Sequence, residues 1–248
     1  MRNFKLTVEY DGAAYCGWQR QKNGPSVQQI LEDAAGTVTS GKVKIVGSGR
    51  TDAGVHAIAQ VASFRSETPL AADKIFRGIN SLLPPDIVVK NLEEVSLDFH
   101  AQRDVTGKTY VYRICNAPLR PVIGREYCWH VRVPLNVDAM REAAGKILGT
   151  HDYSCFCATG TDVADRIRTL RNIQVKTGAN GMLEITVEAK GFLKYMVRNI
   201  VGTLVEVGRG KRKPDDMKDI IASRDRKIAG ATAPAQGLFL KEVKYSKV

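Results

Sequence analysis

The chain has 248 residues, 44% of them hydrophobic, which is enough for one large domain or two smaller ones with buried cores. Lysine and arginine outnumber aspartate and glutamate by 37 to 26, and the resulting net charge of +11 favours a polyanionic partner such as nucleic acid. The longest apolar stretch, residues 192–207, carries three charged side chains and is too short to span a bilayer. The N-terminus has no apolar signal core, so we expect a cytoplasmic protein without a membrane partner.

The first half of the chain alternates between strand and helix patterns. Hydrophobic periodicity predicts strands at 4–10, 43–46, 60–64 and 87–92, and helices at 26–38 and 71–83. Ser26 and Gln29 form a capping box at the start of the first helix, and Pro84 ends the second. The order β-α-β-β-α-β is that of the ferredoxin-like split βαβ arrangement.

The second half repeats this theme with insertions. We expect strands at 108–114, 127–131 and 237–245, a hairpin of 167–176 and 182–189 around an Asn-Gly turn, and helices after Asn136, at 192–207 and at 215–221. The fold class is therefore predicted to be α+β, with two ferredoxin-like lobes of mixed, mainly antiparallel sheets. We expect an N-terminal lobe at 1–105, a C-terminal lobe at 106–248 and a basic cleft between them.

The polar loop at 47–57, Gly-Ser-Gly-Arg-Thr-Asp-Ala-Gly-Val-His-Ala, is the strongest functional signal in the sequence. Its three glycines within eight residues allow positive φ values and close backbone approach. The segment lacks the Gly-x-x-x-x-Gly-Lys-Ser/Thr pattern of a phosphate-binding Walker loop, so the carboxylate of Asp52 is the predicted chemical centre. The alternative interpretation of the loop is a solvated hairpin. We expect His56 to be a hydrogen-bonded structural residue after the loop, and a general base is the alternative interpretation of this histidine.

The five cysteines are odd in number and irregularly spaced, which in a cytosolic chain favours reduced, packed thiols. His151, Cys155 and Cys157 lack the paired spacing of zinc sites, so no metal site is predicted.

Seven short motifs together resemble the TruA-type tRNA pseudouridine synthases over essentially the whole chain. They are Tyr10-Asp11-Gly12 with Gly17-Trp18-Gln19, the loop at 47–57, Asp98-Phe99-His100-Ala101, Lys108-Thr109-Tyr110-Val111-Tyr112, Gly149-Thr150-His151-Asp152, the segment 192–202, and Ala233-Pro234-Ala235-Gln236-Gly237-Leu238. The resemblance implies isomerisation of uridine to pseudouridine at positions 38, 39 and 40 of the tRNA anticodon stem-loop. It also implies a homodimer that binds tRNA and needs no cofactor, metal or nucleotide.

The resemblance also assigns roles to four residues. Asp52 matches the catalytic aspartate, Tyr110 the tyrosine that lies against the target base, Arg198 the basic residue that pairs with the aspartate, and Arg50 a conserved arginine of the catalytic loop. Periodicity alone gives other interpretations, in which Tyr110 is a core residue of a strand and Arg198 extends its charged end to solvent from a core helix.

Further RNA contacts are expected from basic and motif residues spread along the chain. They are Arg77, Phe99, His100, Arg103, Arg168, Lys211 and Arg212, with Arg166 and Arg171 as additional phosphate contacts. Two departures from the family pattern concern RNA selection. Gln102 stands where an arginine is usual, and Cys155 and Cys157 replace serines.

Two alternative functions remain open at this stage. A paralogue with the same catalytic set would modify ribosomal RNA or another tRNA position. A protein of a different class would bind RNA without catalysis. A metal-dependent phosphoesterase is disfavoured because no second cluster of carboxylates is present.

Overall fold

The structure is a computed structural model that describes residues 1–161 and 163–246. The chain forms two compact units, the first made of residues 1–106 with 239–248 and the second of residues 107–238. The last strand, expected in the C-terminal lobe, groups with the first unit from residue 239 onward. Both units combine helices with mainly antiparallel strands, as the α+β prediction requires.

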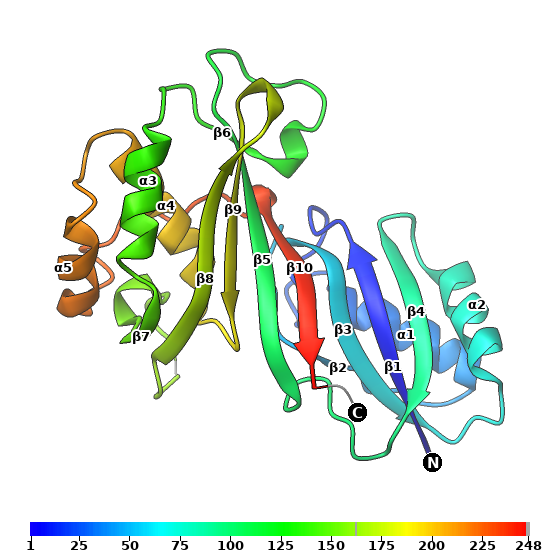
Figure 1. The fold of residues 1–248 in the computed structure, drawn as a ribbon. Helices are drawn as coiled ribbons and strands as arrows, with labels where there is room; N and C mark the ends of the chain where they lie inside the picture. Colours follow the sequence, from blue (N-terminus) through cyan, green and yellow to red (C-terminus); the bar gives the residue numbers. More distant parts are fainter. Residues whose placement is uncertain (162, 247–248) are drawn as a thin grey trace. The chain divides into compact units, whose positions relative to one another are not determined.

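Unit 1 has the strand order of a split βαβ fold. Strand β1 pairs antiparallel with β4 on one side and β3 on the other, and the outer edge of β3 is shared by antiparallel β2 and parallel β10. Helices α1 and α2 pack on one face of this sheet (Figure 1). The elements are β1 (Arg2–Tyr10), α1 (Val27–Thr39), β2 (Val46–Gly47), β3 (His56–Ser66), α2 (Ala72–Leu82), β4 (Ile87–Val95) and β10 (Leu238–Tyr245).

The core of unit 1 follows from alternation along β1. Phe4, Leu6 and Val8 are fully buried, and the Phe4 ring stacks on Phe64 of β3 with 5.2 Å between ring centroids. Side chains at every second position of a strand share one face, so these residues meet the apolar stripes of the two helices. Helix α1 begins after Ser26, whose hydroxyl accepts a hydrogen bond from the Gln29 backbone amide as the capping box predicts.

The strand expected at 43–46 is wrong for most of its length, because β2 contains only Val46 and Gly47. Side chains of α1 take the place of a neighbouring strand at Ile45. Its amide donates to Glu32 Oε1 at 3.1 Å, and its carbonyl accepts from Gln28 Nε2 at 2.8 Å. The backbone is therefore satisfied without forming a longer ladder.

Unit 2 repeats part of the same topology, with strand order β7-β8-β9-β5 and antiparallel pairing throughout. Two-residue β6 lies parallel to β5. Helix α3 packs against α4 and β8. The elements are β5 (Val105–Cys115), β6 (Trp129–His130), α3 (Val137–Gly145), β7 (Gly149–Asp152), β8 (Ile167–Thr177), β9 (Met182–Ala189), α4 (Met196–Gly208) and α5 (Asp216–Ser223).

Three elements of unit 2 differ from expectation. Of the strand expected at 127–131, only Trp129 and His130 form a strand, β6, and Tyr127 ends a 3₁₀ turn, Arg125–Tyr127. Strand β7 was not predicted, because Gly-Thr-His-Asp has no apolar alternation. Helix α4 begins at Met196 and not at 192, because Tyr195 has a left-handed backbone with φ of 63°. Arg198 therefore lies in the first turn of α4.

Candidate active site

The loop that carries Asp52 packs with its main chain against the turn between β1 and α1. A Cβ atom on Gly12 would lie 2.0 Å from the Val55 carbonyl oxygen, and one on Gly17 would lie 2.5 Å from the Thr51 carbonyl oxygen. Gly17 also has a φ of 95°, a conformation that favours glycine. Two segments that are distant in sequence are thus in direct backbone contact, which leaves the loop little freedom to move.

Hydrogen bonds fasten both sides of Asp52. The Trp18 amide donates to the Thr51 carbonyl at 3.1 Å, and the Val55 amide closes a turn on the Asp52 carbonyl at 3.1 Å. The Tyr10 hydroxyl lies 2.7 Å from Thr51 Oγ1. Burial raises the pKa of Tyr10, which therefore remains a neutral hydroxyl. The Asp52 side chain itself is half-buried.

The first part of the loop is held by β3. Ser48 Oγ donates to Gln60 Oε1 at 2.6 Å, and Gln60 Nε2 donates to the Gly49 carbonyl at 3.0 Å. A Cβ atom on Gly47 would collide with the indole of buried Trp18. Of the three loop glycines, Gly54 has a positive φ, at 75°, so close approach and turn geometry use different glycines.

His56 is a buried residue of β3, only 2% exposed, and its ring stacks on Phe239 of β10 at 4.7 Å between centroids. Its Nδ1 lies 3.1 Å from the Gly12 amide and 2.9 Å from Asp11 Oδ1. This environment fits the structural role considered for His56 from the sequence.

Arg50 lies in the same loop and is exposed, but its guanidinium is bound at Nε. Its Nε donates to Gln19 Oε1 at 3.0 Å, and Gln19 in turn donates to buried Gln28 at 2.8 Å. Within residues 1–161 and 163–246, the Nη1 and Nη2 groups of Arg50 have no hydrogen-bond partner. A guanidinium held at Nε presents this terminal fork in the geometry that suits a phosphate or carboxylate.

Tyr110 lies in the middle of β5 and is 8% exposed. Its ring meets Phe192 edge-on, with 5.1 Å between centroids and an interplanar angle of 87°. Tyr112, on the same face, is fully buried and donates from its hydroxyl to the Pro234 carbonyl at 2.7 Å. Burial lowers the pKa of Lys108, two residues before Tyr110, to about 8. The strand therefore buries aromatic rings together with a lysine whose charged form is disfavoured by burial.

Arg198 projects from the first turn of α4 and is half-buried. Its Nε donates to the Ala233 carbonyl at 2.7 Å, and its own carbonyl accepts from the Ala233 amide at 3.1 Å. The guanidinium carbon lies 4.9 Å from the centroid of the Tyr195 ring, a cation–π distance. The side chain is thus oriented by a carbonyl and a ring. This differs from the alternative interpretation, in which Arg198 extends its charged end to solvent.

Buried polar groups join α4 to the segment 226–233. Asn199, which is fully buried, accepts at Oδ1 from Thr232 Oγ1 at 2.6 Å and from Arg226 Nη2 at 3.0 Å. Thr203 Oγ1 accepts from the Gly230 amide at 2.9 Å. These bonds fix the segment that ends in Ala233, the hydrogen-bond partner of Arg198.

The residues predicted as catalytic divide between the two units. Asp52 and Arg50 share one loop of unit 1, while Tyr110 and Arg198 belong to unit 2. The predicted pairing of Arg198 with Asp52 stays a prediction. Sequence reasoning missed Gln28, Asn199 and Arg226 as supporting residues. They make their contacts through the fold, and the local pattern of the sequence gave no signal for them.

The other predicted RNA contacts lie in varied environments. Phe99 packs on Tyr245, and His100 Nδ1 accepts from the amides of Gln102 and Arg103, so this segment is a compact turn. Gln102 and Arg103 themselves are exposed, as is Lys211. Three of the arginines are engaged within the chain, Arg77 with Asp73, Arg168 with Asp165 and Arg212 with Glu206.

The described residues bring no three histidine, cysteine, aspartate or glutamate side chains together as a metal would require. Cys155 and Cys157 are buried free thiols, and burial raises the pKa of Cys155 to about 12. No helix within residues 1–161 and 163–246 combines the length and apolar character needed to cross a membrane.

Comparison with known proteins identifies the family. The pattern described as tRNA pseudouridine synthase matches residues 6–104 and 143–246. The tRNA pseudouridine synthase A 2 of Clostridium perfringens is 48% identical over 245 residues, covering 99% of this chain and 100% of that protein. The tRNA pseudouridine synthases A of Thermoanaerobacter sp. and Myxococcus xanthus are each 45% identical, with 99% of this chain covered and 100% and 92% of theirs. This chain therefore belongs to the tRNA pseudouridine synthase family.

Proposed function

We propose that this protein isomerises uridine to pseudouridine in tRNA, and that its targets are positions 38, 39 and 40 of the anticodon stem-loop. The observation that carries the proposal is the Asp52 loop. A half-buried carboxylate stands between Thr51 and Val55, both of which are fixed through their backbone to the turn after β1. Preorganisation of this kind suits a group that must meet one reacting atom of a bound nucleotide.

The reaction breaks the C1′–N1 glycosidic bond, turns the uracil and rejoins it to C1′ through C5. The C5 proton then leaves, and N1 gains a proton, so the product is an isomer of the substrate. The Asp52 carboxylate acts either as a nucleophile at C1′ or as a base at C2′. Both routes require an ionised carboxylate.

Tyr110 and Arg198 take supporting roles in the proposal. Tyr110 stacks on the uracil once the nucleotide has left the helix, and such stacking contributes about 1–3 kcal/mol per base. Arg198 pairs with Asp52 and opposes the rise in pKa that desolvation by the bound RNA would cause. Its hydrogen bond to Ala233 and its contact with Tyr195 support this role, because they hold the guanidinium in one orientation.

The partner is tRNA, bound by exposed basic residues such as Arg103 and Lys211. We propose a cytoplasmic homodimer that needs no metal or nucleotide. The net charge of +11 supports electrostatic binding. Affinity for tRNA should fall steeply as salt is raised, because each neutralised phosphate releases counterions.

The test is to incubate purified protein, without added metal or nucleotide, with unmodified tRNA transcripts and a ribosomal RNA control. Pseudouridine is then mapped at single-nucleotide resolution. We expect product at positions 38, 39 and 40 of tRNA. Product on ribosomal RNA or at another tRNA position would instead identify the paralogue. Tight binding without product on any RNA would leave a non-catalytic RNA-binding protein.

A further inference from the structure

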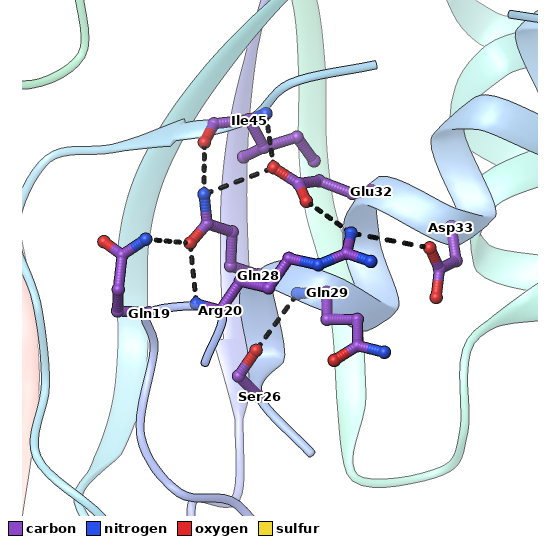
Figure 2. A network of polar contacts seen from close by, with 8 residues as sticks. All are labelled: Gln19, Arg20, Ser26, Gln28, Gln29, Glu32, Asp33 and Ile45. Atoms are coloured by element: carbon purple, nitrogen blue, oxygen red, sulfur yellow. Dashed lines mark hydrogen bonds and ion pairs between the residues drawn. The ribbon is translucent and has the colours of Figure 1, made fainter. Parts of the chain in front are cut away.

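Arg50 is connected to the interior of unit 1 by a chain of side-chain amides. Figure 2 shows its inner part, where Gln28 of α1 lies between Gln19 on one side and Glu32 with Ile45 on the other. Gln28 is 7% exposed, and the side chain of Glu32 is 9% exposed. The row of hydrogen bonds continues from Gln19 to Arg50. It therefore connects the core of unit 1 to the surface of the loop that carries Asp52.

The chemistry of the two ends sets the direction of every amide. Ionised Glu32 and the Ile45 carbonyl only accept hydrogen bonds, so the Gln28 NH₂ group faces them, with donor–acceptor distances of 3.2 and 2.8 Å. Gln28 Oε1 must then face outward, where it accepts from Gln19 Nε2 at 2.8 Å and from the Arg20 amide at 2.9 Å. This turns Gln19 Oε1 toward Arg50, which can only donate.

Arg20 closes the network over Glu32. Its Nη1 lies 3.0 Å from Glu32 Oε2 and 3.9 Å from Asp33 Oδ1 (Figure 2). The carboxylate of Glu32 therefore has a cation at one oxygen, and the Gln28 and Ile45 N–H groups at the other. The buried part of the network, Gln28 with Glu32, is held in one orientation, since a flip of the Gln28 amide would bring two acceptors together at Glu32 and two donors together at Gln19.

We propose that Gln28 and Gln19 are positioning residues, which hold the Arg50 guanidinium at Nε so that its terminal fork faces the bound RNA. This inference rests on the proposed function, because it assigns Arg50 to the RNA-binding loop. The role of Gln28 is indirect. It acts through one intervening side chain, by fixing which atom Gln19 presents to Arg50.

The test is a double-mutant cycle of Gln28→Met with Arg50→Ala, measured by tRNA Kd and single-turnover isomerisation rate. Met matches Gln in size but has no amide, and Gln29→Met is the matched control, since its side chain lies outside the network (Figure 2). We expect Gln28→Met to lower the rate-to-Kd ratio about tenfold, as for one hydrogen bond to a charged group, but less than about twofold when Arg50 is already alanine. Gln29→Met should leave the ratio unchanged within about twofold.

A loss of the same size in both backgrounds would overturn the proposal, because Gln28 would then support the fold and not Arg50. If Gln28→Met fails to fold, Gln19→Met replaces it, because Gln19 is only half-buried. This variant should also lower the rate-to-Kd ratio when Arg50 is present and much less when Arg50 is alanine. A second readout needs no activity. By ¹⁵N NMR, exchange of the Arg50 Nε–H with water should be slow in the wild-type protein and faster in Gln28→Met.

These readouts separate the two proposals. Slow Nε–H exchange that depends on Gln28, in a protein that makes no pseudouridine, would preserve the positioning role and refute the proposed function. Isomerisation with Nε–H exchange that Gln28→Met does not change would do the reverse.

Discussion

The Asp52 loop of unit 1 and helix α4 of unit 2 present functional side chains in contrasting ways. The loop is fixed mainly by main-chain contacts, and two glycines, Gly12 and Gly17, let its backbone touch the preceding turn. Helix α4 is almost entirely buried and is joined to its neighbouring segment by the side chains of Asn199 and Thr203. The loop therefore depends mainly on close main-chain contacts, whereas the helix combines such a contact, at Gly202, with satisfied polar side chains.

The largest effect expected from a single change is that of Asp52→Asn, which removes the carboxylate and leaves the backbone contacts of the loop in place. We expect the single-turnover rate to fall by at least about 10⁴-fold. The tRNA Kd should stay within about tenfold of wild type, since the carboxylate acts mainly in the transition state. Near-normal turnover in this variant would refute the catalytic role of Asp52.

The second prediction compares glycine contacts in the two regions. Alanine at Gly17 would meet the Thr51 carbonyl at 2.5 Å, and alanine at Gly202 in α4 would meet the Ala231 carbonyl at 1.7 Å. We expect each variant to lose about 1–3 kcal/mol or more of unfolding free energy, because backbone atoms must move. The measurement is chemical denaturation with the isomerisation rate followed in parallel.

The control for this pair is Gly145→Ala in α3, where an added Cβ meets nothing within 4 Å. It should stabilise the protein by up to about 1 kcal/mol, because alanine is the better helix former. If Gly17→Ala were as harmless as Gly145→Ala, then the loop would be able to move away from the turn, and the contrast with α4 would not hold.

How far the sequence predicted the two regions follows the same division. The local pattern located the Asp52 loop, the Tyr110 strand and the Ser26 cap, since each depends on neighbours in sequence. It placed the start of α4 four residues too early, because an apolar run gives no sign that Tyr195 has a left-handed backbone conformation.

The supporting contacts could not be predicted for a related reason. Arg50 and Gln19 are 31 residues apart, and Arg198 and Ala233 are 35 apart. Which side chain meets which backbone group at such separations is decided by strand order and helix packing. For the same reason the strand expected at 43–46 was shortened by side chains of α1. Residue type and spacing therefore do not predict these partners.

The third prediction tests how α4 presents its arginine. Arg198→Lys keeps the charge but loses the Nε donor to Ala233 and the planar contact with Tyr195, so we expect a rate loss of about tenfold. Arg198→Ala should lose about 10²-fold or more, because the charge is removed as well. Thermal melting should accompany both assays, since α4 is buried. Equal losses in the two variants would show that geometry and not charge is what Arg198 supplies.

The smallest effect concerns the ion pair between Arg212 and Glu206, which lies near the C-terminal end of α4. Glu206 accepts from the Ala231 amide at 3.1 Å and from Arg212 Nε at 2.6 Å. Burial acts to raise the pKa of Glu206, but these donors outweigh it, so the net shift is downward from the ordinary value of 4.5. A lowered carboxylate pKa contributes stability that is present above pH 4.5 and is lost as the pH falls through the folded-state value.

Arg212→Gln should therefore destabilise the protein at pH 7 by no more than about 1 kcal/mol, given the partial exposure of the pair. The difference from wild type should shrink as the pH falls below 4.5. The matched control is Arg77→Gln in α2, whose ion pair with Asp73 is exposed on both sides and should contribute nothing measurable to stability. Denaturant unfolding at several pH values measures both variants. A pH-independent loss in Arg212→Gln would mean that the Arg212 side chain stabilises α4 by packing and not by its ion pair with Glu206. This end of the helix would then not depend on paired polar side chains, and it would no longer differ in that respect from the Asp52 loop.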